Sequence, residues 1–195
     1  ILDHLPGQGN GSPRFLVEPN QGGRAIDLQI LSLSYGRLVD VYDQEGNGDR
    51  TLVHKDYVIT PSLMSDGVNF ELDRQAVTGQ ERLTILHPVD SPGWDAAFPA
   101  LDAGLVPIQT ADPSGVFFSM VPRNAALVLR LDDQLLADSI NLETVQLYHG
   151  VPSFLPLEAR VFGDPNHGDW AIHPGDSDRT FYTTLSLIHI SEPTR

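Results

Sequence analysis

The chain has 195 residues, and its 12 Lys and Arg against 26 Asp and Glu give a formal net charge of −14. It has no Cys, which excludes disulfide scaffolds and Cys-ligated zinc or iron–sulfur sites. The negative charge argues against a nucleic-acid partner, and no apolar run approaches the roughly 18 to 20 residues of a membrane span. With 41% hydrophobic residues the chain can bury a core, in one or two domains.

The beginning of the chain is predicted to be a linker over residues 1–14. This segment contains repeated Gly and Pro and little apolar content. The chain starts at Ile1 rather than Met, so we expect a fragment of a larger protein.

From Phe15 onward, apolar and polar residues alternate with period two and turn residues are frequent, which predicts short strands. Helical periodicity is nearly absent, with single helical turns expected at 95–101 and 138–142. Many short strands separated by turns predict an all-β fold, specifically an antiparallel β-sandwich. The expected strands cover residues 25–33, 38–42, 51–59, 68–72, 82–85, 115–120, 126–131, 144–148, 157–162 and 180–184.

A composition shift at residues 107–113, with Pro107 and Pro113, indicates a domain boundary. We therefore expect a β-rich domain of unknown family over 15–110 and a second domain over 111–184. A single sandwich whose strands mix across this point is the alternative.

The segment 121–147 carries the most specific fold signal. In its apolar strand, Leu127, Leu129 and Leu131 are expected to lie on the same, core-facing side. The following Asp132-Asp133 is expected to end that strand in a turn. Leu135, Val145 and Leu147 then return to the same core. This pattern resembles a bacterial immunoglobulin-like (Ig-like) domain of the S-layer type, with Leu131 where that family usually has Phe. The resemblance implies an Ig-like sandwich for the second domain and says little about a ligand.

The last eleven residues, 185–195, have the sequence LSLIHISEPTR. This segment resembles the translation of a transposase adapter used in sequencing libraries, so we expect a non-native tail after Thr184. The alternative is a genuine terminal strand, which Leu185, Leu187 and Ile188 would suit.

Two acidic loops are candidate calcium sites. In the first, oxygen donors recur every two residues and Gly48 permits a tight turn, but His54 stands where an EF-hand would have its bidentate Glu. In the second, the donors meet only if the loop folds back. A solvated acidic turn is the preferred interpretation of both loops, and calcium binding is the alternative. The candidate ligands are Asp43, Glu45, Asn47 and Asp49 in the first loop, and Asp164, Asn166, Asp169, Asp176 and Asp178 in the second.

No motif for catalysis is present. The chain lacks a His-Glu-x-x-His pattern, a Gly-x-Ser-x-Gly elbow and a P-loop, so we predict no catalytic residues and no cofactor, with calcium in the acidic loops as the alternative. Trp94 and Trp170 stand in loop-like contexts, where they would serve either as carbohydrate platforms or as core residues.

These features predict a non-catalytic Ig-like structural or interaction module of a larger extracellular or cell-surface bacterial protein. Its expected partners are neighbouring modules of the same chain. Two alternatives stay open: a calcium-stabilised adhesion or carbohydrate-binding module, and an accessory region of a secreted hydrolase.

Overall fold

The computed structural model describes residues 14–17, 26–76, 79–108, 121–122, 125–145, 148–149, 155–156 and 159–189. Strands predominate in these ranges, which confirms the all-β prediction, and none of the described helices has the length and apolar character to cross a bilayer. In chain order the elements are β1 (Arg14–Val17), β2 (Ile26–Gln44), β3 (Arg50–Ile59), β4 (Phe70–Arg74), β5 (Glu81–Ile85), α1 (Pro92–Ala97), the 3-10 helix η1 (Phe98–Ala100), β6 (Val106–Pro107), β7 (Ala126–Leu136), η2 (Ala137–Ser139), β8 (Tyr148–His149), β9 (Leu155–Pro156), β10 (Ala159–Gly163), β11 (Trp170–His173) and β12 (Asp176–His189).

The chain divides into two units, each described here by itself. The central unit is Tyr35–Val106, and the terminal unit combines Ile1–Ser34 with Pro107–Arg195. Strand β2 contributes residues to both units. The predicted division into domains at 15–110 and 111–184 stays a prediction.

The central unit contains a mixed sheet in the order β3–β2–β5–β4. Strands β2 and β3 form an antiparallel hairpin around the predicted acidic loop, and β4 pairs with β5 in the same way. The pairing of β2 with β5 is parallel, with Asp40–Asp43 opposite Arg82–Ile85. The prediction of a purely antiparallel arrangement is therefore not confirmed.

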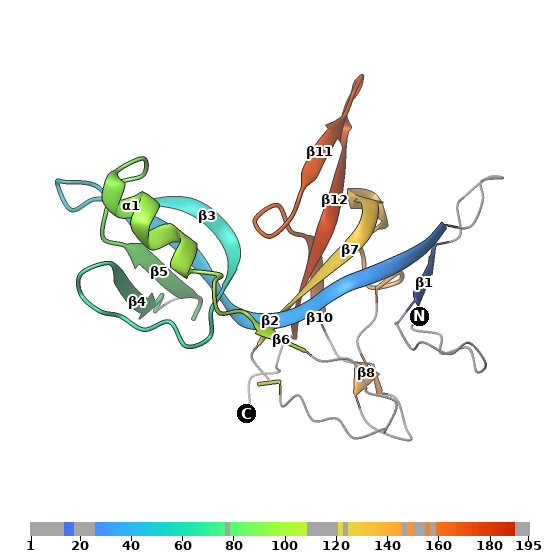
Figure 1. The fold of residues 1–195 in the computed structure, drawn as a ribbon, viewed down its shortest axis with the longest axis horizontal. Coiled ribbons are helices and arrows are strands. Elements are labelled where there is room, and N and C mark those ends of the chain that lie inside the picture. Colours follow the sequence, from blue (N-terminus) through green and yellow to red (C-terminus); the bar gives the residue numbers. More distant parts are fainter. Residues whose placement is uncertain are drawn as a thin grey trace. The chain divides into compact units, whose positions relative to one another are not determined.

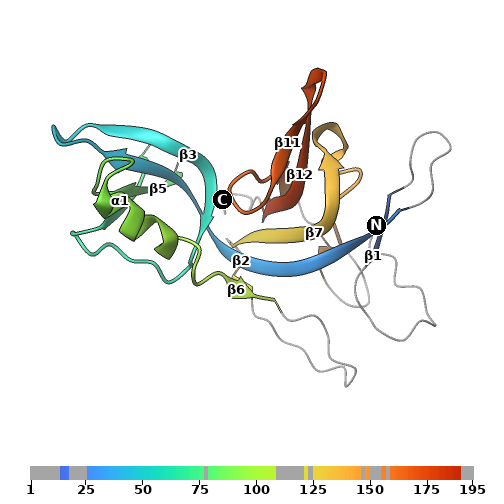
Figure 2. The same cartoon turned by 45° about the horizontal axis from the view of Figure 1, so that its top comes forward.

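Helix α1 packs against the central sheet. It begins at a favourable site, because the Ser91 side chain accepts the Trp94 N–H and Pro92 occupies the first turn. Trp94 and Ala97 are buried in one cluster with strand residues such as Val41 and Leu83. Figures 1 and 2 show α1 lying across one face of this sheet.

The terminal unit contains strands in the order β10–β12–β7–β2, with β1 on β2 and β11 on β12. The pairs β10–β12, β12–β7, β11–β12 and β1–β2 are antiparallel. Its core includes Leu129, Leu131 and Val145, which confirms the burial predicted from the alternating pattern. Leu185 and Leu187 of β12 complete the same cluster, so residues 185–189 of the predicted tail lie in a core strand.

Some predicted elements differ from the structure. Asp132-Asp133 does not end the strand, since β7 continues to Leu136 and the Asp132 carboxylate instead accepts the Gln29 N–H at 2.8 Å. The strand predicted at 115–120 lies outside the described residues, as does Leu147.

Candidate functional site

The first predicted calcium loop joins β2 to β3. Asp43 is buried, and its two carboxylate oxygens accept the N–H groups of Thr51 at 3.2 Å and Val89 at 3.3 Å. At the exposed end of the loop, Asn47 donates to the Asp49 carboxylate at 2.6 Å and accepts the Asp49 N–H. The four candidate ligands therefore do not converge, because Asp43 faces the protein interior while Glu45, Asn47 and Asp49 form the exposed turn.

The second predicted loop joins β10 to β11 and is built around Asp164, whose relative exposure is 0%. Its Oδ2 atom accepts from the Ser186 hydroxyl and lies 2.8 Å from Nδ1 of His167, and its Oδ1 accepts the Asn166 N–H at 2.8 Å. Asp164 thus connects its own loop to β12. A buried carboxylate of this kind is tolerated because its oxygens meet hydrogen-bond donors.

The same contacts set the charge state of Asp164. Burial by itself raises the pKa of this carboxyl, because desolvation penalises the charged form. The hydrogen bond and charge of His167, with the bonds from Ser186 and the Asn166 N–H, outweigh burial and hold the Asp164 pKa below its ordinary value. The ionised form of Asp164 is therefore the one that the fold stabilises.

Backbone and hydroxyl contacts fix the rest of the loop onto β12. The Asp164 N–H donates to the Thr184 carbonyl at 2.9 Å, and the Asp169 N–H donates to the Thr183 hydroxyl at 2.9 Å. A Cβ atom at Gly168 would collide with the side chain of Thr184. Glycine at this position therefore lets the loop approach the strand closely.

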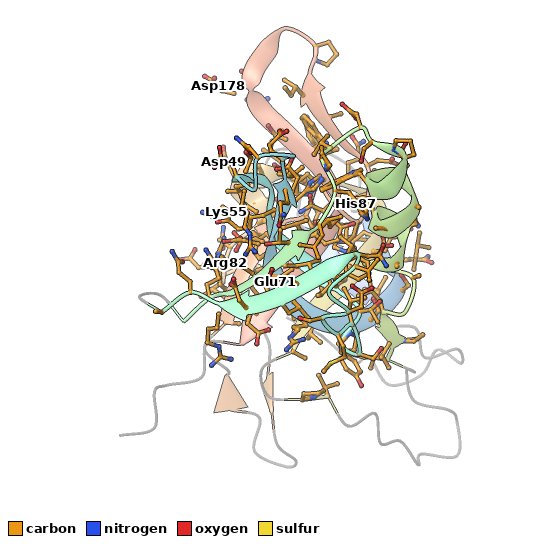
Figure 3. The ribbon with its side chains drawn as sticks, turned by 90° about the vertical axis from the view of Figure 1, so that its left-hand side faces the viewer. Asp49, Lys55, Glu71, Arg82, His87 and Asp178 are labelled. Atoms are coloured by element: carbon orange, nitrogen blue, oxygen red, sulfur yellow. The ribbon has the colours of Figure 1, made fainter. Side chains whose placement is uncertain are left out.

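The three remaining candidate ligands, Asp169, Asp176 and Asp178, lie just before β11 and at the start of β12. Asp176 accepts the Asp178 N–H and forms an ion pair with Arg179 at 3.2 Å, at the start of β12, and Figure 3 shows Asp178 in the same hairpin. Asp169 stands immediately before β11. Across the part of the chain that the structure describes, no three His, Asp or Glu side chains form a group that could hold a metal ion. Calcium binding stays an alternative to the solvated acidic turn for both loops.

Ser186, Asp164 and His167 combine the residue types of a nucleophilic triad, but their arrangement differs from one. In a triad the hydroxyl contacts the imidazole, and the carboxylate contacts the far side of that ring. Here Ser186 and His167 both contact Oδ2 of Asp164. Ser186 is fully buried and the His167 side chain is 4% exposed, so the geometry suits a structural junction.

The two Trp residues have opposite environments. Trp94 is only 7% exposed and stacks on Phe98 with ring centroids 5.4 Å apart, so it is a core residue and is unavailable as a carbohydrate platform. Trp170 on β11 is 52% exposed, and Ile172 on the same strand is 50% exposed. Alternate residues of a strand lie on the same side, so these two side chains share one face.

Sequence reasoning missed an ion-pair network on the central sheet. Arg82 holds both carboxylate oxygens of Asp73, at 2.6 and 2.8 Å, and this carboxylate raises the pKa of Arg82. Arg50 pairs with Asp73 and with Glu71, and Figure 3 shows Glu71 and Arg82 projecting from neighbouring strands. The signal that would have indicated it is the acidic pair at alternate positions of β4, Glu71 and Asp73, together with Arg82 on β5.

Asp66 was also missed as an organiser of the loop before β4. Its carboxylate accepts the N–H groups of Phe70, Val68 and Asn69, all at 2.9 Å or less. These bonds hold the pKa of Asp66 far below its ordinary value. The Asp66-Gly67 pair is the turn signal in the sequence.

Comparisons of the chain with protein-family models, curated proteins and solved structures found no match.

Proposed function

We propose that the chain is a non-catalytic structural and interaction module of a larger extracellular bacterial protein. The observation that carries this proposal is that buried or loop carboxylates are engaged in hydrogen bonds that stabilise turns. Asp43, Asp66 and Asp164 each direct carboxylate oxygens to backbone or side-chain donors that hold a turn in place. In contrast, an apolar pair, Trp170 and Ile172, is presented outward on a hairpin.

An Ig-like sandwich is the finer form of this proposal for the terminal unit. Two features support it: the antiparallel pairs β10–β12 and β12–β7, and the shared core of Leu129, Leu131 and Val145. In a sandwich, inward-facing residues of this kind alternate with outward polar ones along each strand. The central unit differs, because its sheet contains the parallel pair β2–β5.

Sequencing the intact genomic region on both sides of this coding segment tests the proposal. The proposal predicts an export signal and further β-rich modules in the same reading frame. It also predicts that residues 185–195 are replaced by a different continuation after Thr184. A reading frame confined to this segment, or one without an export signal, would contradict the extracellular-module role.

A carbohydrate-binding module is the second candidate function, and the exposed Trp170 favours it. Flat aromatic rings with a polar surround suit sugar recognition, because the ring covers the apolar face of a pyranose. A glycan array that shows binding by the wild type and no binding by Trp170→Ala would support this candidate. Equal signals from both proteins would remove it.

A further inference from the structure

Strand β11 is an edge strand with a free side among the described pairings. It pairs with β12 through Trp170–Tyr182, Ala171–Phe181 and Ile172–Thr180, and no other described strand pairs with it. An edge strand directs part of its N–H and C=O groups away from the sheet, where another extended chain can meet them. Figures 1 and 2 show β11 beside β12, on the side of β12 away from β7.

The side chains of β11 do not protect this edge. Proteins commonly block a free edge with charged residues, and two other strands with one described partner follow this rule. Strand β4 carries Glu71, Asp73 and Arg74, and β10 carries Arg160. Strand β11 has the sequence Trp-Ala-Ile-His, without Asp, Glu, Lys or Arg, and exposes half of Trp170 and of Ile172.

The surroundings of β11 are acidic. Asp169 precedes the strand, and Asp176 and Asp178 follow it at the start of β12, against the single cation Arg179. A second copy of the chain would bring the same three carboxylates to this edge, and each copy has a formal net charge of −14. Like charges oppose that pairing, whereas a basic segment is attracted to the three carboxylates.

We infer that the free edge of β11 binds an extended, basic segment of a partner protein, which adds to the sheet as a further strand. This inference rests on the interaction role proposed above and names the class of partner. Backbone hydrogen bonds along β11 provide the pairing. Trp170 and Ile172 select a segment with apolar residues at alternate positions, and the flanking Asp residues select Lys or Arg at its ends.

The test uses the full chain and three fluorescent synthetic peptides. The first alternates Val and Thr and ends in Lys at both termini, the second replaces Lys by Glu, and the third is the Lys peptide with every backbone N–H methylated. We expect the Lys peptide to bind saturably and the other two to bind at least about tenfold more weakly. Fluorescence polarisation measures the affinities, and backbone NMR shifts locate the peptide.

Two protein variants complete the design. Ile172→Lys places a charge on the proposed edge and should weaken binding by about tenfold or more. Leu142→Lys changes a similarly exposed apolar residue of the same unit, which is 48% exposed, and should leave the affinity unchanged. Melting temperatures of both variants establish that the fold is intact.

Three outcomes would overturn the inference: no saturable binding of the Lys peptide, equal affinity for the Lys and Glu peptides, or NMR shifts outside β11. Self-association of the chain through β11, seen by analytical ultracentrifugation, would identify a second copy as the occupant and would also overturn it. None of these outcomes bears on the export signal and neighbouring modules, so the genomic test of the proposed function stands separately.

Discussion

Replacing Asp164 by Ala is expected to destabilise the terminal unit more than most surface changes would. Asp164 is fully buried, and its loss leaves three donors without their acceptor: the Ser186 hydroxyl, the His167 ring and the Asn166 N–H. A buried polar group that loses its partner costs about 1 to 3 kcal/mol. The Asn166 N–H is less buried and can bond to water instead, so the Ser186 and His167 donors account for most of the cost. The expected loss in unfolding free energy is about 3 to 4 kcal/mol.

Two further variants calibrate this value. Asp164→Asn keeps the size of the side chain and one oxygen acceptor for the Asn166 N–H, so about 1 to 2 kcal/mol should be lost. Asp169→Asn alters a carboxylate in the same loop whose bonds to Thr183 are made by the backbone, and it should change stability by less than about 0.5 kcal/mol.

Urea denaturation followed by far-UV circular dichroism measures these differences, and amide hydrogen exchange at Asn166 reports on the loop itself. Exchange at Asn166 should accelerate in Asp164→Ala and not in Asp169→Asn. An unfolding free energy for Asp164→Ala within about 1 kcal/mol of the wild type would refute the reasoning, because the buried donors would then have found other partners.

Four other results are expected. Stability should fall as the pH drops below about 4, because Asp66 and Asp164 have a lower pKa in the fold than when unfolded; both are ionised above the unfolded value and must take up protons below it. Acid titration monitored by circular dichroism should show a smaller loss for Asp66→Asn than for the wild type, and an equal loss would argue against this carboxylate. Asp73→Asn removes a partner of both Arg50 and Arg82 and should cost about 1 kcal/mol in urea denaturation, less in about 1 M salt; a cost that does not depend on salt would point to packing instead. Leu187→Ala should lower the unfolding free energy by about 2 to 4 kcal/mol, because Leu187 is 3% exposed in the terminal core, whereas Leu142→Ala should change it little. Millimolar calcium should shift the melting temperature by less than about 1 °C, since Asp43 and Asp164 already accept hydrogen bonds; a larger rise that disappears in Asp49→Asn or Asp178→Asn would favour a calcium site.

Local patterns predicted the local parts of this fold. Alternation around Leu129 placed the core face of β7, and the Gly- and Asp-rich segment before Arg50 located the turn of the β2–β3 hairpin. The parallel pairing of β2 with β5 was not predictable in this way. It joins segments far apart in the chain, and side-chain alternation reports which face is buried but not which strand lies alongside.

In the candidate site, too, local features were predictable from the sequence and contacts between distant segments were not. Asp164 was identified as a polar loop residue, yet its burial depends on Ser186 of a strand that returns to it later in the chain. Trp94 was placed in a loop because Pro92 and Gly93 precede it. Ser91 followed by Pro92 is also the signature of a helix start, and reading it so would have placed Trp94 on a short buried helix.

On the proposal that a different sequence follows Thr184 in the natural gene, the places of Leu185, Ser186 and Leu187 in β12 constrain that sequence. A continuation that preserves this strand must supply apolar residues at the first and third places, and a small hydroxyl-bearing residue between them that reaches Asp164. Genomic reads spanning the junction can be scored against this three-residue rule before any protein is made.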